Sequence, residues 1–296
     1  MFSQYFGNYL LNKKLVTTQE LNEALDYQKS IRVKLGVLAI NLGYMNSSQV
    51  QEVHQQQMRI DKRFGEIAIE FGYLTSQQLQ SLLTTQKQGH LQLSQALIDK
   101  NYLTLEQLED ELENYKQDCQ LTHEELEIIK QGNIDKLVEL FLDFKDPFEQ
   151  KIYNNYVALL LKNIIRLLDT TPRLEKALPS TDYYAEKLVC QNISGEHTLY
   201  TALACDERAF LTIGSKFARE EIQTSNELTQ ASVAEFLNVH NGIFLVNMSN
   251  QNIELQMKPH QIYFQIHLKK QTNTHIIPIH LTNCSFALII SDSEII

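Results

Sequence analysis

Glu235 and Asn238 stand three residues apart in the apolar segment ASVAEFLNVHNGIFLVNM at residues 231–248. If this segment is a helix, the spacing places a carboxylate and a carboxamide on one face. Such a pair is a candidate for polar chemistry, and the alternative is an ordinary solvated helix face. His240 follows closely and is a further candidate, as a general base, although two residues along a helix it points away from that face.

A second set of candidate residues belongs to an internal repeat near the N-terminus. Frames of about 24 residues recur every 29 residues, beginning at Tyr5, Lys34, Arg63 and Gln92. The third position of each frame is glycine, except in the last, which has serine. A glutamine closes the first three frames, at Gln28, Gln57 and Gln86. A polar residue at a fixed phase is not required by packing, although a purely structural helical array remains the alternative.

The elements that must position these residues follow from the pattern within each frame. Apolar positions six and seven precede a residue that suits a left-handed turn, namely Gly43, Gly72 or Asn101, whereas Lys14 is the misfit. A helix-capping pattern then opens a longer apolar stretch with helical spacing, at Thr17, Asn46, Thr75 and Thr104. Each frame therefore predicts a short helix, a turn and a longer helix, and neighbouring frames must stack to bury their apolar stripes.

Charge is unevenly distributed along the repeat. Residues 29–63 include six cationic and only two acidic residues, although the whole chain carries a net charge of −10. The six cations are Lys29, Arg32, Lys34, Arg59, Lys62 and Arg63. A basic zone at the junction of the second and third frames indicates an anion site in an otherwise acidic protein.

The doubled frame resembles the N-terminal domain of MshE-type secretion ATPases (MshEN), a family that binds cyclic di-GMP. The resemblance covers residues 5 to about 115, and it implies that the frame's cation and glutamine contact the nucleotide while its apolar residues pack against it. Lys34 replaces an arginine of the family pattern, and Phe64 replaces a leucine. Carried over to this chain, the cyclic di-GMP residues are Lys34, Leu35, Gly36, Gln57, Arg63, Phe64, Gly65 and Gln86.

The second half of the chain has a different pattern. After an apolar helix at 149–168, alternating and β-branched stretches predict strands at 186–194, 197–206 and 208–214. Helices are predicted at about 215–223 and 226–248, and strands at 253–258, 262–270, 275–281 and 285–291. Gly195 and Asn273 mark turns. The prediction is an α+β domain with an antiparallel sheet.

The spacing A-x-x-x-E-x-x-N-x-x-x-G, from Ala231 to Gly242 and followed by Pro259, resembles the CheC/CheX/FliY chemotaxis phosphatases. The resemblance covers about residues 148–296. It implies that this helix docks on a phosphorylated response-regulator receiver, with Asn238 positioning the attacking water and Glu235 pairing with a receiver lysine. The receiver would bring its own magnesium, so no intrinsic cofactor is expected. Many family members have an acid or serine where this chain has Ala231, which leaves a binding-only domain open.

Composition limits the remaining classes of function. The net charge of −10 argues against nucleic-acid binding. The apolar runs are too short for membrane insertion. The four scattered cysteines favour a reducing cytoplasm. We predict no metal site, because His260, His267, His275 and His280 lack partners at ligand spacing. The sequence leaves open whether the chain forms a homodimer.

The predicted organisation is therefore multidomain. An all-α, four-frame helical-hairpin domain at 1–117 is followed by a helical connector at 118–147 and a CheX-like α+β domain at 148–296. Our hypothesis is a cyclic di-GMP-responsive protein that binds and dephosphorylates a receiver in motility or chemotaxis signalling. The alternative is a non-enzymatic adaptor whose repeats dock a pilus, secretion or motility protein and whose second domain only binds a receiver.

Overall fold

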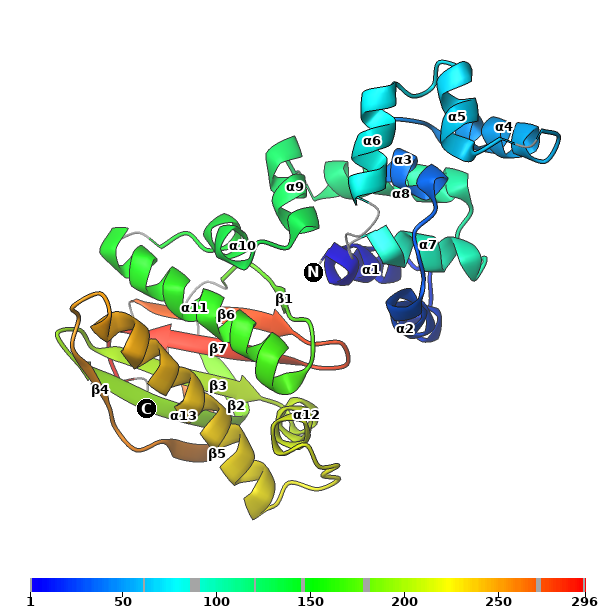
Figure 1. Cartoon of the computed structure of the whole chain (residues 1–296). Coiled ribbons are helices and arrows are strands. Elements are labelled where there is room, and N and C mark those ends of the chain that lie inside the picture. The colour runs from blue at the N-terminus through cyan, green and yellow to red at the C-terminus, as the bar shows by residue number, and fades with distance from the viewer. Residues whose placement is uncertain are drawn as a thin grey trace. The chain divides into compact units, whose positions relative to one another are not determined.

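The computed structural model describes residues 2–60, 62–85, 91–119, 121–144, 147–177, 182–269, 273–294 and 296. The chain divides into two compact units, Met1–Gly132 and Asn133–Ile296, which are coloured from blue to red along the chain in Figure 1. The residues predicted as a connector are divided between the two units, because one of their helices belongs to each.

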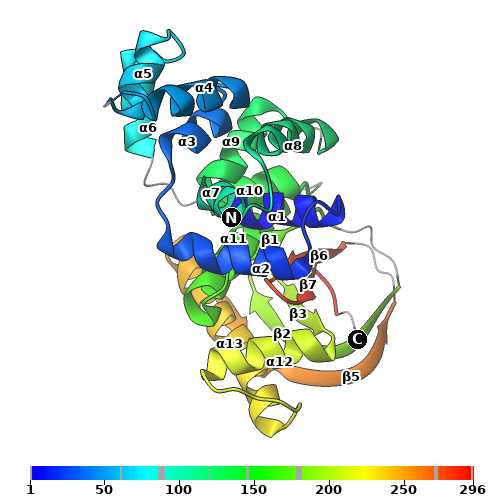
Figure 2. The same cartoon turned by 90° about the vertical axis from the view of Figure 1, so that its right-hand side faces the viewer.

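The described residues of the first unit form helices in pairs (Figure 2). In most pairs a short helix precedes a longer one. The helices are α1 (Phe2–Asn12), α2 (Thr18–Tyr27), the 3-10 turn η1 (Gln28–Ser30), α3 (Leu35–Asn41), α4 (Ser47–Gln57), α5 (Phe64–Glu70), α6 (Ser76–Thr85), α7 (Gln92–Asp99), α8 (Leu105–Asp118) and α9 (His123–Gln131).

The turns and helix starts of this unit follow the local sequence signals. Reciprocal hydrogen bonds between a cap residue and the residue three positions later open helices at Thr17, Asn46, Thr75, Thr104 and Thr122. Each such cap contributes about 1 kcal/mol. The tenth frame positions all have a left-handed φ, and these are Lys14, Gly43, Gly72 and Asn101. Lys14 therefore adopts the turn although its side chain disfavours that conformation.

The frame glycines allow the paired helices to approach closely. A Cβ atom added at Gly36 would lie 2.7 Å from Cγ1 of Val50, and one added at Gly65 would lie 2.6 Å from Cδ1 of Leu79. Val50 and Leu79 occupy the same position of their respective frames, in the second helix of each pair. Packing within each pair thus accounts for glycine at the third frame position.

The second unit is an α+β fold with an antiparallel sheet, as predicted. Its helices are α10 (Ile134–Phe141), α11 (Pro147–Leu168), α12 (Glu207–Ala218) and α13 (Glu227–Ser249). Its strands are β1 (Arg173–Leu174), β2 (Tyr183–Gly195), β3 (Leu199–Cys205), β4 (Leu255–Met257), β5 (Gln261–Leu268), β6 (Thr274–His280) and β7 (Ser285–Ser291). Within the described residues the strand order is β1-β6-β7-β3-β2-β4, and β5 also pairs with β2.

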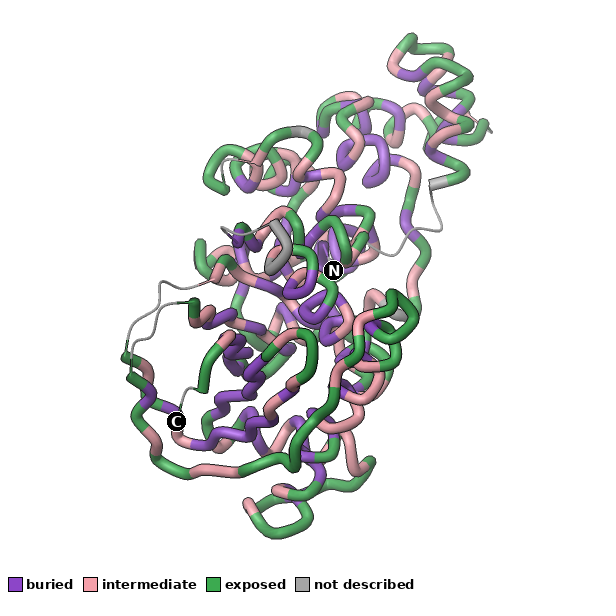
Figure 3. The backbone as a smooth tube through the Cα atoms, turned by 90° about the vertical axis from the view of Figure 1, so that its left-hand side faces the viewer, coloured by how far each residue is buried: buried purple, intermediate pink, exposed green. Residues whose placement is uncertain are grey.

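The core of the second unit lies between the sheet and the helices. Helices α11 and α13 cover one face of the sheet (Figure 1). Strand β3 is buried along its whole length and β7 along nearly all of it. Figure 3 colours the buried segments of the backbone purple. Large side chains such as Tyr156, Phe210 and Phe244 fill this layer. The core therefore fixes α13 against the sheet along its inner face.

The predicted strand at 208–214 was wrong, because these residues lie in α12. Asp206 caps this helix by accepting a hydrogen bond from the Ala209 N–H at 2.7 Å. The buried residues Phe210 and Ile213 then recur at helical spacing. A short apolar run fits either a strand or a helix, and the cap decides for the helix. The predicted helix at 215–223 is accordingly only the end of α12, which stops at Ala218.

The structure bears on two expectations from composition, those about membrane-spanning segments and about the cysteines. None of the described helices is both long and apolar enough to cross a bilayer. The four cysteines all lie within the described residues and are free thiols. Burial raises the pKa of the Cys190 thiol to about 11 and also raises the pKa of Cys205. These two cysteines are therefore small core residues.

Candidate functional site

Glu235 and Asn238 lie next to each other on the outer side of α13. Asn226 caps the helix, accepting a hydrogen bond from the Thr229 N–H at 3.0 Å. The pair begins six residues after Thr229. Glu235 is exposed, Asn238 is half-buried, and Asn238 Nδ2 donates to Glu235 Oε2 at 3.2 Å. The structure thus brings the carboxylate and the carboxamide together, as their spacing predicts.

Gln191 connects Asn238 to the sheet. This residue lies on β2 and is only 2% exposed. Its Nε2 donates to Asn238 Oδ1 at 3.0 Å and to the backbone carbonyl of Lys258 at 2.9 Å. Gln191 is not among the residues predicted from the sequence to be functional. A signal was available, because Gln191 is a polar residue at the same inward phase as Val189 and Ile193.

A buried polar network continues beneath Gln191. Asn241 is fully buried, and its Nδ2 donates to Gln191 Oε1 at 2.8 Å and to Thr201 Oγ1 at 3.2 Å. The Tyr156 hydroxyl donates to Asn241 Oδ1 at 2.6 Å. Buried polar groups that are hydrogen-bonded in this way are rigidly held, because breaking any contact leaves an unpaired group in the core. The surface amide of Asn238 therefore rests on a fixed support.

His240 belongs to the core and not to the surface pair. Its ring is fully buried, with Nδ1 3.1 Å from Asn163 Nδ2 and the ring centroid 4.4 Å from that of Tyr156. Burial lowers the pKa of His240 from 6.5 to about 3. The candidate role of His240 as a general base, which its spacing already disfavours, is excluded because the ring is buried away from the surface.

The outer stripe of α13 also carries apolar residues. Leu228 is 44% exposed and Val246 is 61% exposed, and both share the helix face of Glu235 by their spacing. Met257 on β4 and Phe264 on β5, two strands that contact α13, are also exposed. We call these four residues together with Glu235 and Asn238 the α13 surface. A polar pair flanked by exposed apolar side chains is typical of a protein-binding surface.

The predicted residues of the first unit are partly brought together. Phe64 is buried and lies 5.1 Å from His54 between ring centroids, and both lie close to Gly36. Burial lowers the pKa of His54, and the charge of nearby Lys34 lowers it further. The Gln57 side chain donates to the Lys62 carbonyl at 3.4 Å. The second and third frames therefore meet at this point.

Lys34 has protein partners of its own. Its Nζ lies 2.9 Å from Asp99 Oδ1, and its backbone N–H donates to Gln95 Oε1 at 2.8 Å. The Lys34 side chain is nevertheless 63% exposed, so the ion pair leaves most of it in contact with solvent.

The other predicted nucleotide residues lie in different environments. Leu35 is half-buried at the start of α3, Gly65 is buried in α5, and the Arg63 side chain is exposed. The Arg63 backbone N–H donates to Glu66. Gln86 lies outside the described residues.

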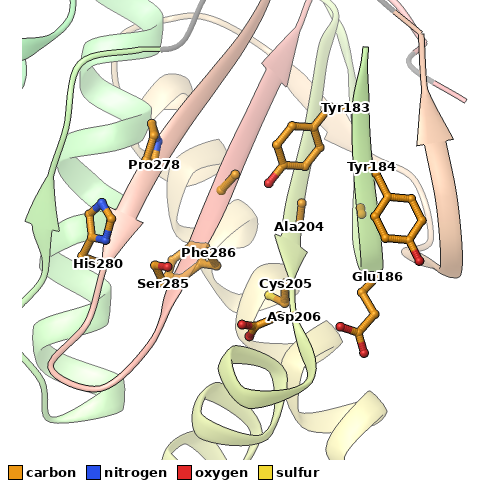
Figure 4. A pocket seen from close by; sticks show the side chains of 12 residues that line it. Tyr183, Tyr184, Glu186, Ala204, Cys205, Asp206, Pro278, His280, Ser285 and Phe286 are labelled. Atoms are coloured by element: carbon orange, nitrogen blue, oxygen red, sulfur yellow. The ribbon is translucent and has the colours of Figure 1, made fainter. Parts of the chain in front are cut away.

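Two cavities occur away from these residues. One of about 710 Å3 in the first unit is bounded by the α3–α4 turn, α8 and α9, and none of the predicted nucleotide residues lines it. The other, of about 370 Å3, lies at the sheet of the second unit between Tyr183 on β2 and His280 on β6 (Figure 4). Neither Glu235 nor Asn238 lines it. Within the described residues, no cluster of three histidine, cysteine or acidic side chains could hold a metal ion.

Comparisons with known proteins find similarity in structure only. No protein-family model matches the chain, and no curated protein matches its sequence. CheX from Desulfovibrio desulfuricans is similar at 12% identity with a TM-score of 0.43, covering 48% of this chain and 99% of that one. CheX from Vibrio vulnificus gives 14% identity, a TM-score of 0.43, and coverage of 48% and 98%. The CheX–CheY–BeF3–Mg2+ complex from Borrelia burgdorferi gives 14% identity, a TM-score of 0.40, and coverage of 48% and 98%.

Proposed function

We propose that the second unit binds the phosphorylated receiver domain of a response regulator in the cytoplasm and hydrolyses its aspartyl phosphate. The observation that supports this most directly is the contact between Glu235 and Asn238 on the α13 surface. The pair faces outward, apolar side chains flank it, and the core holds Asn238 through Gln191. A carboxamide fixed on a docking surface is suited to chemistry on another protein.

The proposed reaction needs only one positioned water from this chain. The water oxygen attacks phosphorus, the bond from phosphorus to the aspartyl oxygen breaks, and the receiver carboxylate and inorganic phosphate are released. The water proton passes to the phosphate product. Asn238 Oδ1 accepts one hydrogen bond from Gln191 and has a second lone pair with which to hold the water. Positioning is the main contribution in such phosphoryl transfers, and the receiver carries the magnesium ion.

Glu235 has a separate proposed role. Its exposed carboxylate can pair with a lysine ammonium of the receiver and so fix the docking angle. Its contact with Asn238 Nδ2 keeps the carboxylate next to the reacting position. We therefore expect Glu235 to affect receiver affinity and Asn238 to affect the rate of hydrolysis.

The test measures phosphate release from the receiver domains encoded by the same organism, each phosphorylated with acetyl phosphate. We expect Asn238→Ala to lower the rate for the responsive receiver by about 100-fold while its affinity stays within about threefold. Asn247→Ala is the matched control, because Asn247 is an exposed asparagine of α13 outside the α13 surface. If no receiver is dephosphorylated faster by the wild-type protein, the enzymatic proposal is wrong.

A binding-only adaptor is the alternative, and Ala231 is the observation that favours it. Ala231 is exposed, one turn before Glu235, and it offers no polar side chain there. An adaptor would bind a receiver through the α13 surface without accelerating phosphate release. Binding of a receiver treated with beryllium fluoride, with no effect on dephosphorylation, would support the adaptor.

For the first unit we propose cyclic di-GMP as the ligand. What supports this is the meeting of the second and third frames around Phe64 and Gly36, next to the exposed cations Lys34 and Arg63. Guanidinium groups bind phosphate and stack on bases. Isothermal titration with cyclic di-GMP should show binding at micromolar concentration or below that Arg63→Ala abolishes. Arg59→Ala is the control, because Arg59 is an exposed cation of the same basic zone outside the frame positions.

The proposed link between the two units is that the nucleotide changes receiver binding or dephosphorylation. Phosphate release measured with and without saturating cyclic di-GMP tests this link. Equal rates and equal receiver affinities in the two conditions would leave two independent functions on one chain.

A further inference from the structure

We infer that Gln191 fixes the orientation of the Asn238 carboxamide, with Oδ1 facing β2 and the NH2 group facing Glu235. The catalytic meaning of this inference rests on the proposed function. Gln191 is a positioning residue, because at 2% exposure it cannot touch a partner and can act only through Asn238.

The orientation can be followed from the sheet outward, beginning at Thr201. Its hydroxyl donates to the backbone carbonyl of Gln191 at 3.0 Å. A hydroxyl has one hydrogen, so the Thr201 oxygen can only accept from its other neighbour, Asn241. The group of Asn241 that faces Thr201 must therefore be the NH2 group, at 3.2 Å.

The same NH2 group of Asn241 fixes Gln191. It lies 2.8 Å from the Gln191 side chain, so the atom that it meets must be the acceptor Oε1. The Gln191 NH2 group then points the other way. An independent contact agrees, because the backbone carbonyl of Lys258 at 2.9 Å can only accept.

Asn238 is the last amide of this chain of contacts. Because the Gln191 NH2 group faces it at 3.0 Å, the contacting atom of Asn238 must be Oδ1. Its NH2 group consequently faces the Glu235 carboxylate at 3.2 Å, which is an acceptor. A reversed Gln191 amide would set oxygen against oxygen at both Lys258 and Asn238. The Lys258 carbonyl and the Glu235 carboxylate, at opposite ends of the network, can only accept hydrogen bonds and thus select one orientation of the amides.

The consequence is that the reacting amide is arranged before any partner arrives. Asn238 presents a lone pair of Oδ1 and one N–H in fixed directions, and no rearrangement is needed when the phosphoryl group docks. Gln191 also binds the Lys258 carbonyl and so ties the segment between β4 and β5 to the same support. The direction of the surface amide is therefore determined by a buried residue of the sheet.

The first test is structural and does not depend on activity. In the full-length protein, the side-chain 15N order parameter of the Asn238 NH2 group reports its restriction on the picosecond-to-nanosecond timescale. We expect a restricted group in the wild type and a clearly lower order parameter in Gln191→Met, which keeps the length of the side chain but removes both amide functions. Asn163→Leu is the matched control, because Asn163 is an equally buried amide that contacts His240 and not Asn238.

The second test uses the double-mutant cycle with Asn238→Ala. Gln191→Met should lower kcat for receiver dephosphorylation by about tenfold or more, leave KM within about twofold, and have no further effect in the Asn238→Ala background. Asn163→Leu should leave kcat unchanged. A decrease in kcat of the same size in both backgrounds would show that Gln191 acts through general stability, and would overturn the inference.

The two tests separate failure of this inference from failure of the proposed function. If the wild type dephosphorylates no receiver but Asn238 becomes mobile in Gln191→Met, the orientation is established and the enzymatic proposal falls. If Asn238 is equally restricted in the wild type and in Gln191→Met, the inference is wrong whatever the activity.

Discussion

The helical pairs of the first unit and helix α13 of the second unit both carry the residues that the sequence marks as functional, but those residues have different contacts. In the first unit Gly36 and Gly65 allow close helix packing, Phe64 is buried, and Lys34 pairs with Asp99. In the second unit Glu235 extends from the surface. Contacts within the fold can explain a repeated motif without a ligand, whereas they do not explain an exposed acid beside a supported amide.

The same contrast occurs within α13, between amides three residues apart. Asn238 faces outward, whereas Asn241 is fully buried and forms hydrogen bonds with three side chains. Both residues are asparagines of the same helix. Only the burial of the side chain separates a structural role from a candidate functional one.

The largest effect is expected for Asn241→Leu, which should lower the free energy of unfolding of the second unit by about 3 to 4 kcal/mol. The reason is that the Tyr156 hydroxyl and the side-chain oxygen of Gln191 would both lose a hydrogen-bond partner in the core. Asn238→Ala should lower that free energy by only about 1 kcal/mol, because a single N–H of Gln191 loses its acceptor at a half-buried position. Urea denaturation of the full chain, with the transition assigned by hydrogen exchange, measures both. Similar losses for the two variants would remove the contrast between them.

The buried His240 should make the second unit sensitive to acid. Its pKa falls from 6.5 to about 3 on folding because of burial. The unfolded chain therefore takes up a proton that the folded chain refuses between these pH values, and stability falls as the pH falls below 6.5. His240→Gln should remove about 2 to 3 kcal/mol of the loss between pH 7 and pH 4. An equal loss of stability between pH 7 and pH 4 in His240→Gln and in the wild type would contradict this prediction.

A smaller effect is expected for Gly36→Ala. The new Cβ would lie 2.7 Å from Cγ1 of the fully buried Val50, and overpacking should cost about 1 to 2 kcal/mol even after the gain in helix propensity. Ser94→Ala is the control, because the fourth frame already carries a Cβ at this position, and its effect should be below about 1 kcal/mol. Thermal unfolding measures both. A stable Gly36→Ala protein that fails to bind cyclic di-GMP would instead favour a ligand role for Gly36.

The smallest effect is expected for the ion pair between Lys34 and Asp99. Because the Lys34 side chain is mostly exposed, the double-mutant cycle of Lys34→Met with Asp99→Asn should give a coupling of about 0.5 kcal/mol that decreases with added salt. If Lys34→Met lowers stability by several times this amount, the lysine is a structural residue of the first unit. If stability is unchanged and nucleotide binding is lost, Lys34 is a ligand residue.

Local signals allowed much of the fold to be predicted. The caps at Thr17, Asn46 and Thr104 begin helices where the sequence indicates, since the bonds that define a cap lie within four residues of the chain. The strand at 208–214 was wrong because alternation and helical spacing cannot be distinguished over seven residues. Lys14 shows the reverse case, where the geometry of the turn overrides the preference of the residue.

The candidate site was predictable only in part, because its support is not local. Glu235 and Asn238 share a face by spacing, whereas the partners of Asn238 come from elsewhere in the chain. Gln191 is separated from Asn238 by 47 residues in the sequence. It is separated by 67 residues from Lys258, whose carbonyl accepts the other hydrogen bond of the Gln191 NH2 group. The packing of α13 on β2 and the pairing of β2 with β4 bring these groups together. The depth of His240 likewise depends on α11, which contributes Tyr156 and Asn163.

Strand β2 pairs with β3 directly after a turn, but its partners on the other side, β4 and β5, follow much later in the chain. Loop closure over such separations is slow, so the edge that carries the Lys258 carbonyl forms only when most of the unit has been synthesised and folded. Until that edge forms, the Gln191 NH2 group lacks its Lys258 acceptor, and only the contact with Asn241 selects the orientation of the Gln191 amide. The activity proposed for the second unit would therefore be lower in chains that have not completed the sheet.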